Sequence, residues 1–296
     1  MPVDLILLLL SPIFFLFIGF EWYVTARQRL AIYQWRDSLA NLLLAAMHQA
    51  GDFLALLLIL PLWHYLYQFA LFPLELNWQT GFLLFLLQDF LYYWFHRCSH
   101  HVRWLWASHV VHHSSRLMNF STAFRQSLTY QISGMWLFWT PLVLLGFSPT
   151  QVLAVVVLNL AFQFFVHTRW GRHWGWLGLV INTPAWHRVH HACNEPYIDR
   201  NFAGVLIIWD RLFGTFTPEH ANIPCQYGIT DDFHSNNALD ITLFEWRRIW
   251  RDWRAATGLQ AACRALLGRP YADSYPNSSD TVGLDRVSPS ADESKT

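Results

Sequence analysis

Residues 96–113 read HRCSHHVRWLWASHVVHH, and six of these positions are histidine. A further array, HRVHH, follows at residues 187–191. HVVHH at residues 109–113 and HRVHH share the pattern His-x-x-His-His, which on a helix places positions i, i+3 and i+4 on one face. Three imidazoles on one helical face indicate a metal site, because imidazole is a ligand that suits iron, zinc and copper.

Eleven of the fifteen histidines lie between residues 96 and 191. The candidate metal ligands among them are His96, His100, His109, His112, His113, His167, His187, His190 and His191. Nine nitrogens exceed what one ion takes, so they predict two ions in a shared all-histidine environment. Without a metal, desolvating this many imidazoles at one face would cost free energy with no return.

The remaining histidines receive more ordinary interpretations. We interpret His48, His64, His220 and His234 as interfacial or hydrogen-bonded side chains, because each stands alone in the sequence. His101 and His173 stay unassigned at this stage.

The composition indicates a membrane protein, with 54% apolar and 17% aromatic residues. Apolar runs occupy residues 2–20, 39–60, 80–95, 134–147 and 150–166. A bilayer core needs about 20 helical residues, so the first two runs can span it outright and the third can with its flanks. The last two form a predicted hairpin that either spans the membrane or dips in and returns. We therefore expect an all-α integral membrane fold with about four to five transmembrane or re-entrant helices.

Arginines predict the orientation of this fold. Arg27, Arg29 and Arg36 follow the first apolar run, which suits an uncleaved anchor whose C-terminal end is cytoplasmic. Residues 61–79 contain no Lys or Arg and should lie on the other side. Every histidine array then reaches the cytoplasmic face as a helical cap that binds two metals, at the inner membrane of a bacterium or the endoplasmic reticulum of a eukaryote.

The chain is interpreted as one membrane-embedded domain over residues 1–262, followed by a C-terminal segment, 263–296, that is largely a disordered tail because it is rich in Ser, Asp and Pro. Residues 240–267 predict a helix with tryptophans and arginines interleaved. This pattern is typical of a helix that lies at the level of the lipid headgroups. A helix packed against the rest of the protein would account for the pattern equally well. We expect no nucleic-acid partner, because no basic strand pattern with interleaved aromatic residues is present.

Five motifs together carry a family resemblance. They are DFLYYWFHR at 89–97, HVVHH at 109–113, TPAWHRVHH at 183–191, DRNFAG at 199–204 and WDRLFGTF at 209–216. With them, residues 80–220 resemble the fatty acid hydroxylase/sterol desaturase superfamily of integral-membrane di-iron enzymes. NFSTAFRQ at 119–126, QFFVHT at 163–168 and GVLIIWD at 204–210 are similar to the alkylglycerol monooxygenase-like branch.

The resemblance implies an oxidoreductase with two non-haem iron ions held by the nine histidines, with His167 joining the third array. It implies O2-dependent hydroxylation of an unactivated C–H bond of a lipid chain or sterol, for example next to an ether oxygen. Desaturation within the same superfamily is the alternative. From the residues alone, a histidine-rich membrane metal transporter or sensor is a further alternative.

The electron donor stays open between a reduced pterin and a separate donor protein or reductant. The branch has an acidic residue directly after the second histidine of the first array, whereas this chain has His101. Around the ligands, Asp89 lies on the same helical face as His96 and is expected to accept the ring N–H of a ligand histidine. Asp199 and Asn201 are expected to support the ligands or position the cap.

Overall fold

The computed structural model describes residues 3–171 and 173–270, with side chains described from Leu9 onward. Within these residues the fold is all-helical and contains only two isolated β-bridges. The α-helices are α1 (Val3–Arg27), α2 (Trp35–Tyr67), α3 (Trp78–His101), α4 (Arg103–His113), α5 (Tyr130–Ser133), α6 (Thr140–Leu145), α7 (Pro149–Phe164), α8 (Pro184–His190), α9 (Ile208–Leu212), α10 (Ala238–Ala255) and α11 (Leu259–Leu267). Short 3-10 helices are η1 (Phe120–Phe124), η2 (Met135–Phe138) and η3 (Gly175–Leu179).

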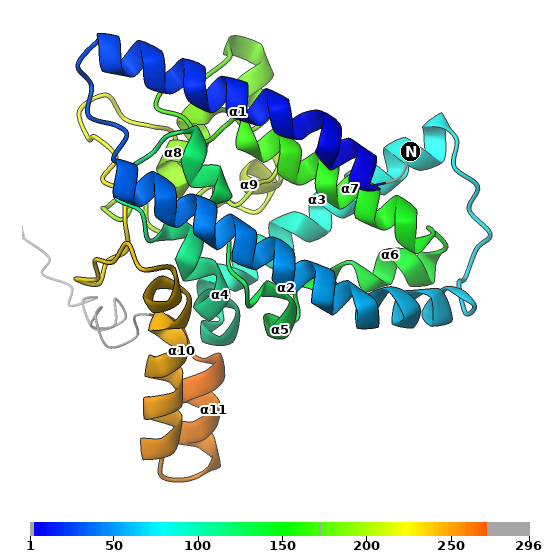
Figure 1. The fold of residues 1–296 in the computed structure, drawn as a ribbon. Coiled ribbons are helices and arrows are strands. Elements are labelled where there is room, and N and C mark those ends of the chain that lie inside the picture. The colour runs from blue at the N-terminus through cyan, green and yellow to red at the C-terminus, as the bar shows by residue number, and fades with distance from the viewer. Residues whose placement is uncertain (1–2, 172, 271–296) are drawn as a thin grey trace, which may run out of the picture.

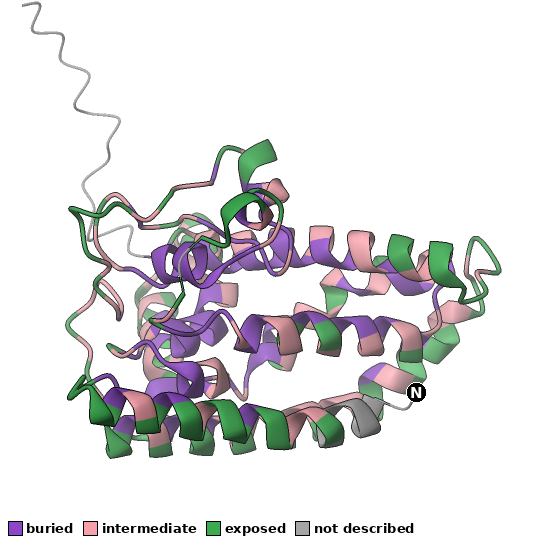
Figure 2. Cartoon of the chain, turned by 90° about the horizontal axis from the view of Figure 1, so that it is seen from above, coloured by how far each residue is buried: buried purple, intermediate pink, exposed green. Residues whose placement is uncertain are grey.

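The four longest helices of the body, α1, α2, α3 and α7, run alongside one another (Figure 1). Helix α1 packs against α7, and α3 packs against both α7 and α4. Helices α1, α3 and α7 end at the same end of the molecule, where α4 and α8 lie (Figure 1). Buried residues gather at that end (Figure 2). The fold thus brings the histidine-bearing segments together.

Helices α1 and α2 are long and apolar enough to cross a membrane. Large apolar side chains on α2 face outward, including Leu58 at 78% exposure and Phe53 at 67%. Contiguous apolar surface of this kind is unfavourable in water and suits lipid. These features agree with the membrane protein that the composition predicts. The third predicted run lies within α3, and the last two lie within η2–α6 and α7, which are shorter apolar helices.

Local sequence signals fix the helix ends that matter for the site. Asn77 begins α3 with a capping box, in which its side chain accepts from the backbone of Thr80 and the Thr80 hydroxyl accepts in return. Ser148 and Pro149 begin α7 in the same way. Val102 has extended backbone and separates α3 from α4. This break allows the histidines of α4 to turn back toward those of α3.

An apolar core fills the space between α2, α3, α6 and α7, with Trp63, Tyr92, Phe95, Trp139 and Val152 among its buried members. The predicted boundary after residue 262 falls inside α11. Of the predicted C-terminal segment, 263–296, residues 263–267 belong to α11, and residues 271–296 lie outside the described residues.

Candidate metal centre

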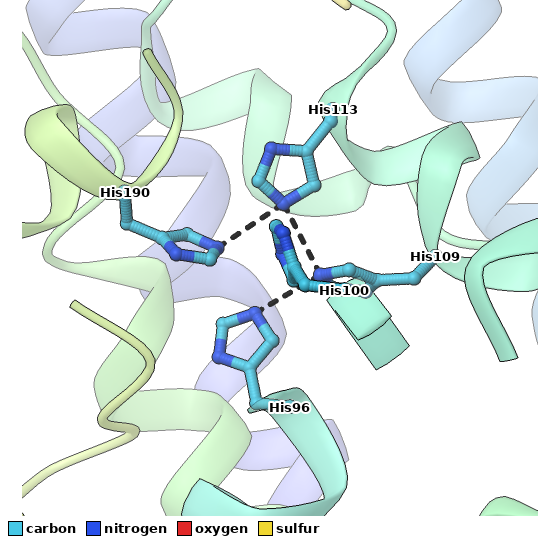
Figure 3. Close-up of side chains that lie close together, drawn as sticks. All are labelled: His96, His100, His109, His113 and His190. Carbon is cyan, nitrogen blue, oxygen red and sulfur yellow. Dashed lines mark hydrogen bonds between the residues drawn. The ribbon is translucent and has the colours of Figure 1, made fainter. Parts of the chain in front are cut away.

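Five imidazoles converge at the C-terminal end of α3. His96 and His100 come from α3, His109 and His113 from α4, and His190 from α8. One ring nitrogen of each lies within 4.8 Å of those of the other four, and every ring is buried. Figure 3 shows the rings pointing toward a common centre from these three helices.

Contacts between Nε2 atoms link four of these five histidines. Nε2 of His109 lies 3.0 Å from that of His96 and 3.1 Å from that of His113. Nε2 of His113 lies 3.1 Å from that of His190. Figure 3 marks these three contacts.

A four-histidine group lies directly beside the first. It consists of His112, His167, His187 and His191, all buried, with ring nitrogens within 4.8 Å of one another. Nε2 of His167 lies 3.0 Å from that of His112 and 2.9 Å from that of His187. The rings of His113 and His191 stack at 4.5 Å between centroids, which joins the two groups. All nine predicted histidines thus fall into these two groups, divided five and four.

Most of the nine rings are oriented by a partner on Nδ1. The carbonyl oxygens of Phe202, Arg125, Gln163 and Arg200 lie within 2.6 to 3.1 Å of Nδ1 of His96, His112, His167 and His190, respectively. The Tyr130 hydroxyl lies 2.8 Å from Nδ1 of His109, and the Asp199 carboxylate lies 3.2 Å from Nδ1 of His100. A carbonyl oxygen can only accept, so Nδ1 carries the proton and the Nε2 lone pair faces the group.

This donor set fits two metal ions. Lone pairs on neutral Nε2 atoms about 3 Å apart repel one another unless a cation lies between them. Nε2 of His100 is buried and has no hydrogen-bond partner among the described residues, so it is free to bind an ion. All-imidazole sets suit iron, zinc or copper rather than calcium or magnesium.

The electrostatics also favour neutral, ligand-ready imidazoles. Burial lowers the pKa of His109, His113 and His190 well below the ordinary value of 6.5, and neighbouring imidazoles lower it further. Burial lowers the pKa of His167 to about 4. The rings therefore stay unprotonated at neutral pH, as metal binding requires.

These pKa shifts predict that the metal-free protein loses stability in mild acid. In the unfolded chain the imidazole pKa is near 6.5, whereas in the folded chain that of His167 is about 4. Below pH 6.5 the unfolded chain therefore binds more protons, and the unfolding free energy falls as the pH drops toward 4. Thermal unfolding of the metal-free protein at several pH values measures this, and a midpoint that does not fall with pH would contradict it.

A loop between α8 and α9 supplies two of the carbonyl acceptors. Arg200 and Phe202 lie beside Asp199 and Asn201, whose backbones are left-handed with φ of 55° and 57°. Asp and Asn adopt this conformation more readily than most residues, which accounts for their place in the DRNFAG motif. The carboxylate of Asp210 accepts from the backbone N–H groups of Phe202 and Ala203 at 2.8 Å each. Asp210 therefore holds the loop that orients His96 and His190.

Asp89 holds the next part of the same loop. Its carboxylate accepts from the backbone N–H groups of Val205 at 2.9 Å and Leu206 at 3.0 Å, and from the Trp209 indole at 2.9 Å. Among its described hydrogen bonds none goes to a histidine, so the predicted contact with a ligand ring is absent. Asp89 and His96 share a helical face, but the loop comes between the carboxylate and the rings. A Cβ on Gly204 would lie 2.7 Å from the Asn159 amide oxygen, so this close approach requires glycine.

Asp199 and Asn201 differ in their relation to the rings. Asp199 contacts His100 as expected. The Asn201 side-chain amide donates to the carbonyls of Trp186 and Thr217, so Asn201 positions the loop against α8 and contacts no imidazole through these bonds. His101 bonds to the carbonyl of Arg97 at 2.8 Å and lies outside both groups.

The other histidines also lie outside both groups. His173 stacks on Trp186. His48 and His64 bond to the backbone carbonyls of Ser127 and Leu60. His220 stacks on Tyr197, and His234 lies 3.6 Å from Asp232.

Two features of the site, the Tyr130 hydroxyl and the Arg125–Asp37 ion pair, were not predicted from the sequence. Tyr130 is a single tyrosine ahead of an apolar run, and no spacing relates it to His109. Arg125 forms a buried ion pair with Asp37 at 3.3 Å. This pair fixes Arg125, whose backbone carbonyl accepts from Nδ1 of His112. A backbone carbonyl that accepts a hydrogen bond cannot be predicted from residue types. The only sequence feature noted around Arg125 was the motif NFSTAFRQ, which contains it.

Tyr130→Phe is expected to weaken metal binding at the five-histidine group. The substitution removes the hydroxyl that lies 2.8 Å from Nδ1 of His109 and so frees the ring to rotate. Loss of such a partner lowers metal affinity by about 10- to 100-fold. Competition with a chelator measures the affinity, with the exposed Tyr65→Phe as control. Equal affinities for the two variants would show that Tyr130 does not orient the ligand.

Comparison with known proteins identifies the class. Residues 81–215 match the fatty acid hydroxylase family. This match agrees with the resemblance that the motifs carry, and the matched stretch contains all nine clustered histidines.

Individual relatives within this class of protein are lipid monooxygenases and hydroxylases. The chain is 47% identical to alkylglycerol monooxygenase of Danio rerio, over 60% of this chain and 40% of the relative, and 44% identical to that of Homo sapiens, over 63% and 41%. It is 31% identical to an ornithine lipid hydroxylase of Rhizobium tropici, over 52% and 47%. The similarity to the alkylglycerol monooxygenase-like branch is thereby confirmed, although the chain spans less than half the length of these relatives. No solved structure matches the chain.

Proposed function

We propose that this protein is a membrane-bound, O2-dependent di-iron monooxygenase that hydroxylates an ether lipid at the carbon next to the ether oxygen. The observation that carries the proposal is the pair of adjacent, buried imidazole groups, five and four, whose Nε2 atoms face one another. The names of the relatives, alkylglycerol monooxygenase and lipid hydroxylase, support an oxygenase that acts on lipid. Hydroxylation at that carbon gives a hemiacetal, which separates into an aldehyde and an alcohol.

Each group is proposed to hold one iron ion. The His96, His100, His109, His113 and His190 imidazoles would hold one, and those of His112, His167, His187 and His191 the other. When bound and reduced, the irons would supply the activation of dioxygen that insertion into an unactivated C–H bond needs.

The chain's own residues supply orientation and exclusion of water. Carbonyls and side chains that accept from Nδ1 fix six of the rings, so the nitrogens are preorganised before a metal arrives. Tyr92 lies beside His96, with ring centroids 5.4 Å apart, and stacks on Trp139. The rings of Tyr92 and Trp139 belong to the apolar core between α2, α3, α6 and α7, which keeps water from this side of the histidine groups.

We also propose that the two groups lie on the cytoplasmic face and that α3 and the α6–α7 hairpin enter the membrane beside α1 and α2. Arg27, Arg29 and Arg36 lie where α1 ends and α2 begins, at the same end of the body as the histidines. Residues 61–79, at the other end, contain no Lys or Arg. This asymmetry favours the cytoplasm for the histidine end. An inner membrane or endoplasmic reticulum would provide that arrangement.

Purified protein in lipid vesicles tests the function. An alkylglycerol and an acylglycerol of equal chain length are offered with iron, oxygen and either a reduced pterin or a reduced electron-donor protein. We expect about two irons per chain, oxygen uptake and a long-chain aldehyde from the ether lipid alone. The active donor in this assay identifies the natural class of reductant.

Three other outcomes would overturn parts of the proposal. A hydroxylated lipid without cleavage would retain the enzyme class and reject the carbon next to the ether oxygen. An alkene product would replace hydroxylation with desaturation. Bound zinc without oxygen uptake under either donor, together with metal flux across the vesicle membrane, would replace the enzyme with a transporter.

A further inference from the structure

An exposed apolar stripe runs along α10. Leu239, Leu243, Trp250 and Trp253 are 57%, 37%, 58% and 43% exposed. Their spacing of three, four and seven residues places them on one face of the helix, together with Trp246. The Trp250 and Trp253 rings stack at 5.4 Å between centroids. These four large apolar side chains are therefore exposed, and no other described helix covers the stripe that they form.

One member of the stripe, Trp246, contacts a segment that packs on α2. Trp246 donates from its indole nitrogen to the Thr129 hydroxyl at 3.0 Å. The neighbouring residue, Leu128, lies against Gly51 in the middle of α2, where an added Cβ would be 2.8 Å from a Leu128 methyl group. Figure 1 shows that α10 and α11 project from the histidine end of the body, transverse to α2. A helix transverse to a membrane-spanning helix lies along the membrane plane.

The adjacent face of α10, about a third of a turn from the stripe, is fixed to α4, which carries His109, His112 and His113. Ile241, Glu245 and Ile249 are buried, and α10 packs against α4. Arg103, the first residue of α4, donates to Glu245 at 2.6 Å and to Asp252 at 2.7 Å. These bonds hold α10 in one rotation about its axis, so the stripe cannot turn inward to join a core.

Arginines flank the stripe on one side. Arg247, Arg251 and Arg254 are exposed, and the Arg254 guanidinium lies 6.0 Å from the Trp250 ring centroid. Arg247 and Arg251 pair with Asp240 and Asp252, but exposed pairs of this kind are weak and exchange readily for another anion. Tryptophan beside arginine is the arrangement that suits the boundary between lipid headgroups and acyl chains.

We propose that α10 lies on the surface of the membrane, with the stripe inserted among lipid headgroups and the upper acyl chains, and with Arg247, Arg251 and Arg254 on lipid phosphates. The occupant of the stripe is therefore a phospholipid bilayer that contains anionic lipid. Because Arg103 joins α10 to α4, this anchor sets the height of α4 and its histidines relative to the membrane. The surface is additional to the metal centre and uses none of its ligands.

Photo-crosslinking in vesicles tests the proposal. Trp250→p-benzoyl-phenylalanine and Trp253→p-benzoyl-phenylalanine are compared with Ala255→p-benzoyl-phenylalanine in full-length protein. Ala255 is also exposed, but five residues after Trp250 it lies nearly on the other side of the helix. The vesicles contain phosphatidylcholine and phosphatidylglycerol with a radiolabelled acyl chain. We expect positions 250 and 253 to capture labelled lipid about fivefold or more above position 255.

Three outcomes would overturn the proposal. Equal lipid capture at positions 250 and 255 would show that the stripe has no special exposure to lipid. A crosslinked pair of chains from position 250 would assign the stripe to a second copy of the protein, and a crosslink within one chain would assign it to internal packing. Capture that is unchanged in vesicles of phosphatidylcholine alone would remove the role of the arginines. The readout is a lipid adduct, so it does not depend on metal content or product formation.

Discussion

His112→Ala is expected to abolish metal binding at the four-histidine group and product formation with it. His112 contributes a buried Nε2 that lies 3.0 Å from that of His167, and its neighbour His113 belongs to the other group. Removal of one ligand from a set of four leaves three imidazoles and an open coordination position, so the ion is held weakly. We expect a loss of more than about 100-fold in turnover. Iron per chain, measured by elemental analysis, should fall in parallel.

A matched histidine separates ligand loss from general damage. His64→Ala removes an exposed ring that bonds only to its own helix, through the carbonyl of Leu60. This variant should keep full iron content and turnover. Both variants should insert into membranes equally, since His112→Ala leaves α1 and α2 unchanged and His64→Ala only shortens one exposed side chain in the last turn of α2. Wild-type iron content and turnover in His112→Ala would reject its assignment as a ligand.

The second large effect is expected from Asp89→Ala. The carboxylate is fully buried and accepts from the backbone N–H groups of Val205 and Leu206, the Trp209 indole and the Asn159 amide. Truncation leaves these donors buried without an acceptor. Each buried donor that loses its acceptor costs about 1–3 kcal/mol, and the Val205, Leu206 and Trp209 donors all do so, hence we expect the unfolding free energy to fall by about 3 kcal/mol or more. The loop that orients His96 should loosen at the same time.

Thermal unfolding and iron content together measure this effect. Asp89→Asn keeps the shape of the side chain and one acceptor oxygen, so it should fall between the wild type and the alanine variant. Glu75→Gln, at an exposed carboxylate, is the control. If Asp89→Ala unfolds at the same temperature as Glu75→Gln and retains its iron, the carboxylate does not support the metal centre.

Much of the site was predictable because its signals are local. His-x-x-His-His on a helix places its rings on one face whatever the rest of the chain does. Length and apolar character alone likewise predicted α1 and α2 as membrane helices. The capping box at Ser148 and the Pro149 that follows mark the start of α7 within the sequence itself.

Contacts between distant segments were less predictable. Asp89 was expected to bond to a ligand ring because it shares a helical face with His96. It bonds instead to Val205 and Leu206, more than a hundred residues away in sequence, because the loop fits between α3 and α7. No spacing along the chain encodes that insertion. The same holds for Tyr130, whose hydroxyl reaches His109 only after the chain has turned back.

The sequence by itself predicted nine candidate histidine ligands in a chain long and apolar enough to enter a membrane, because ligand type and helical spacing are local properties. Only the tertiary structure decided how they divide. His112 and His113 are adjacent in sequence yet belong to different groups, and His190 and His191 separate in the same way. Neighbouring residues on a helix point about 100° apart, so the packing of α4 against α3 and α8 assigns each ring to its group.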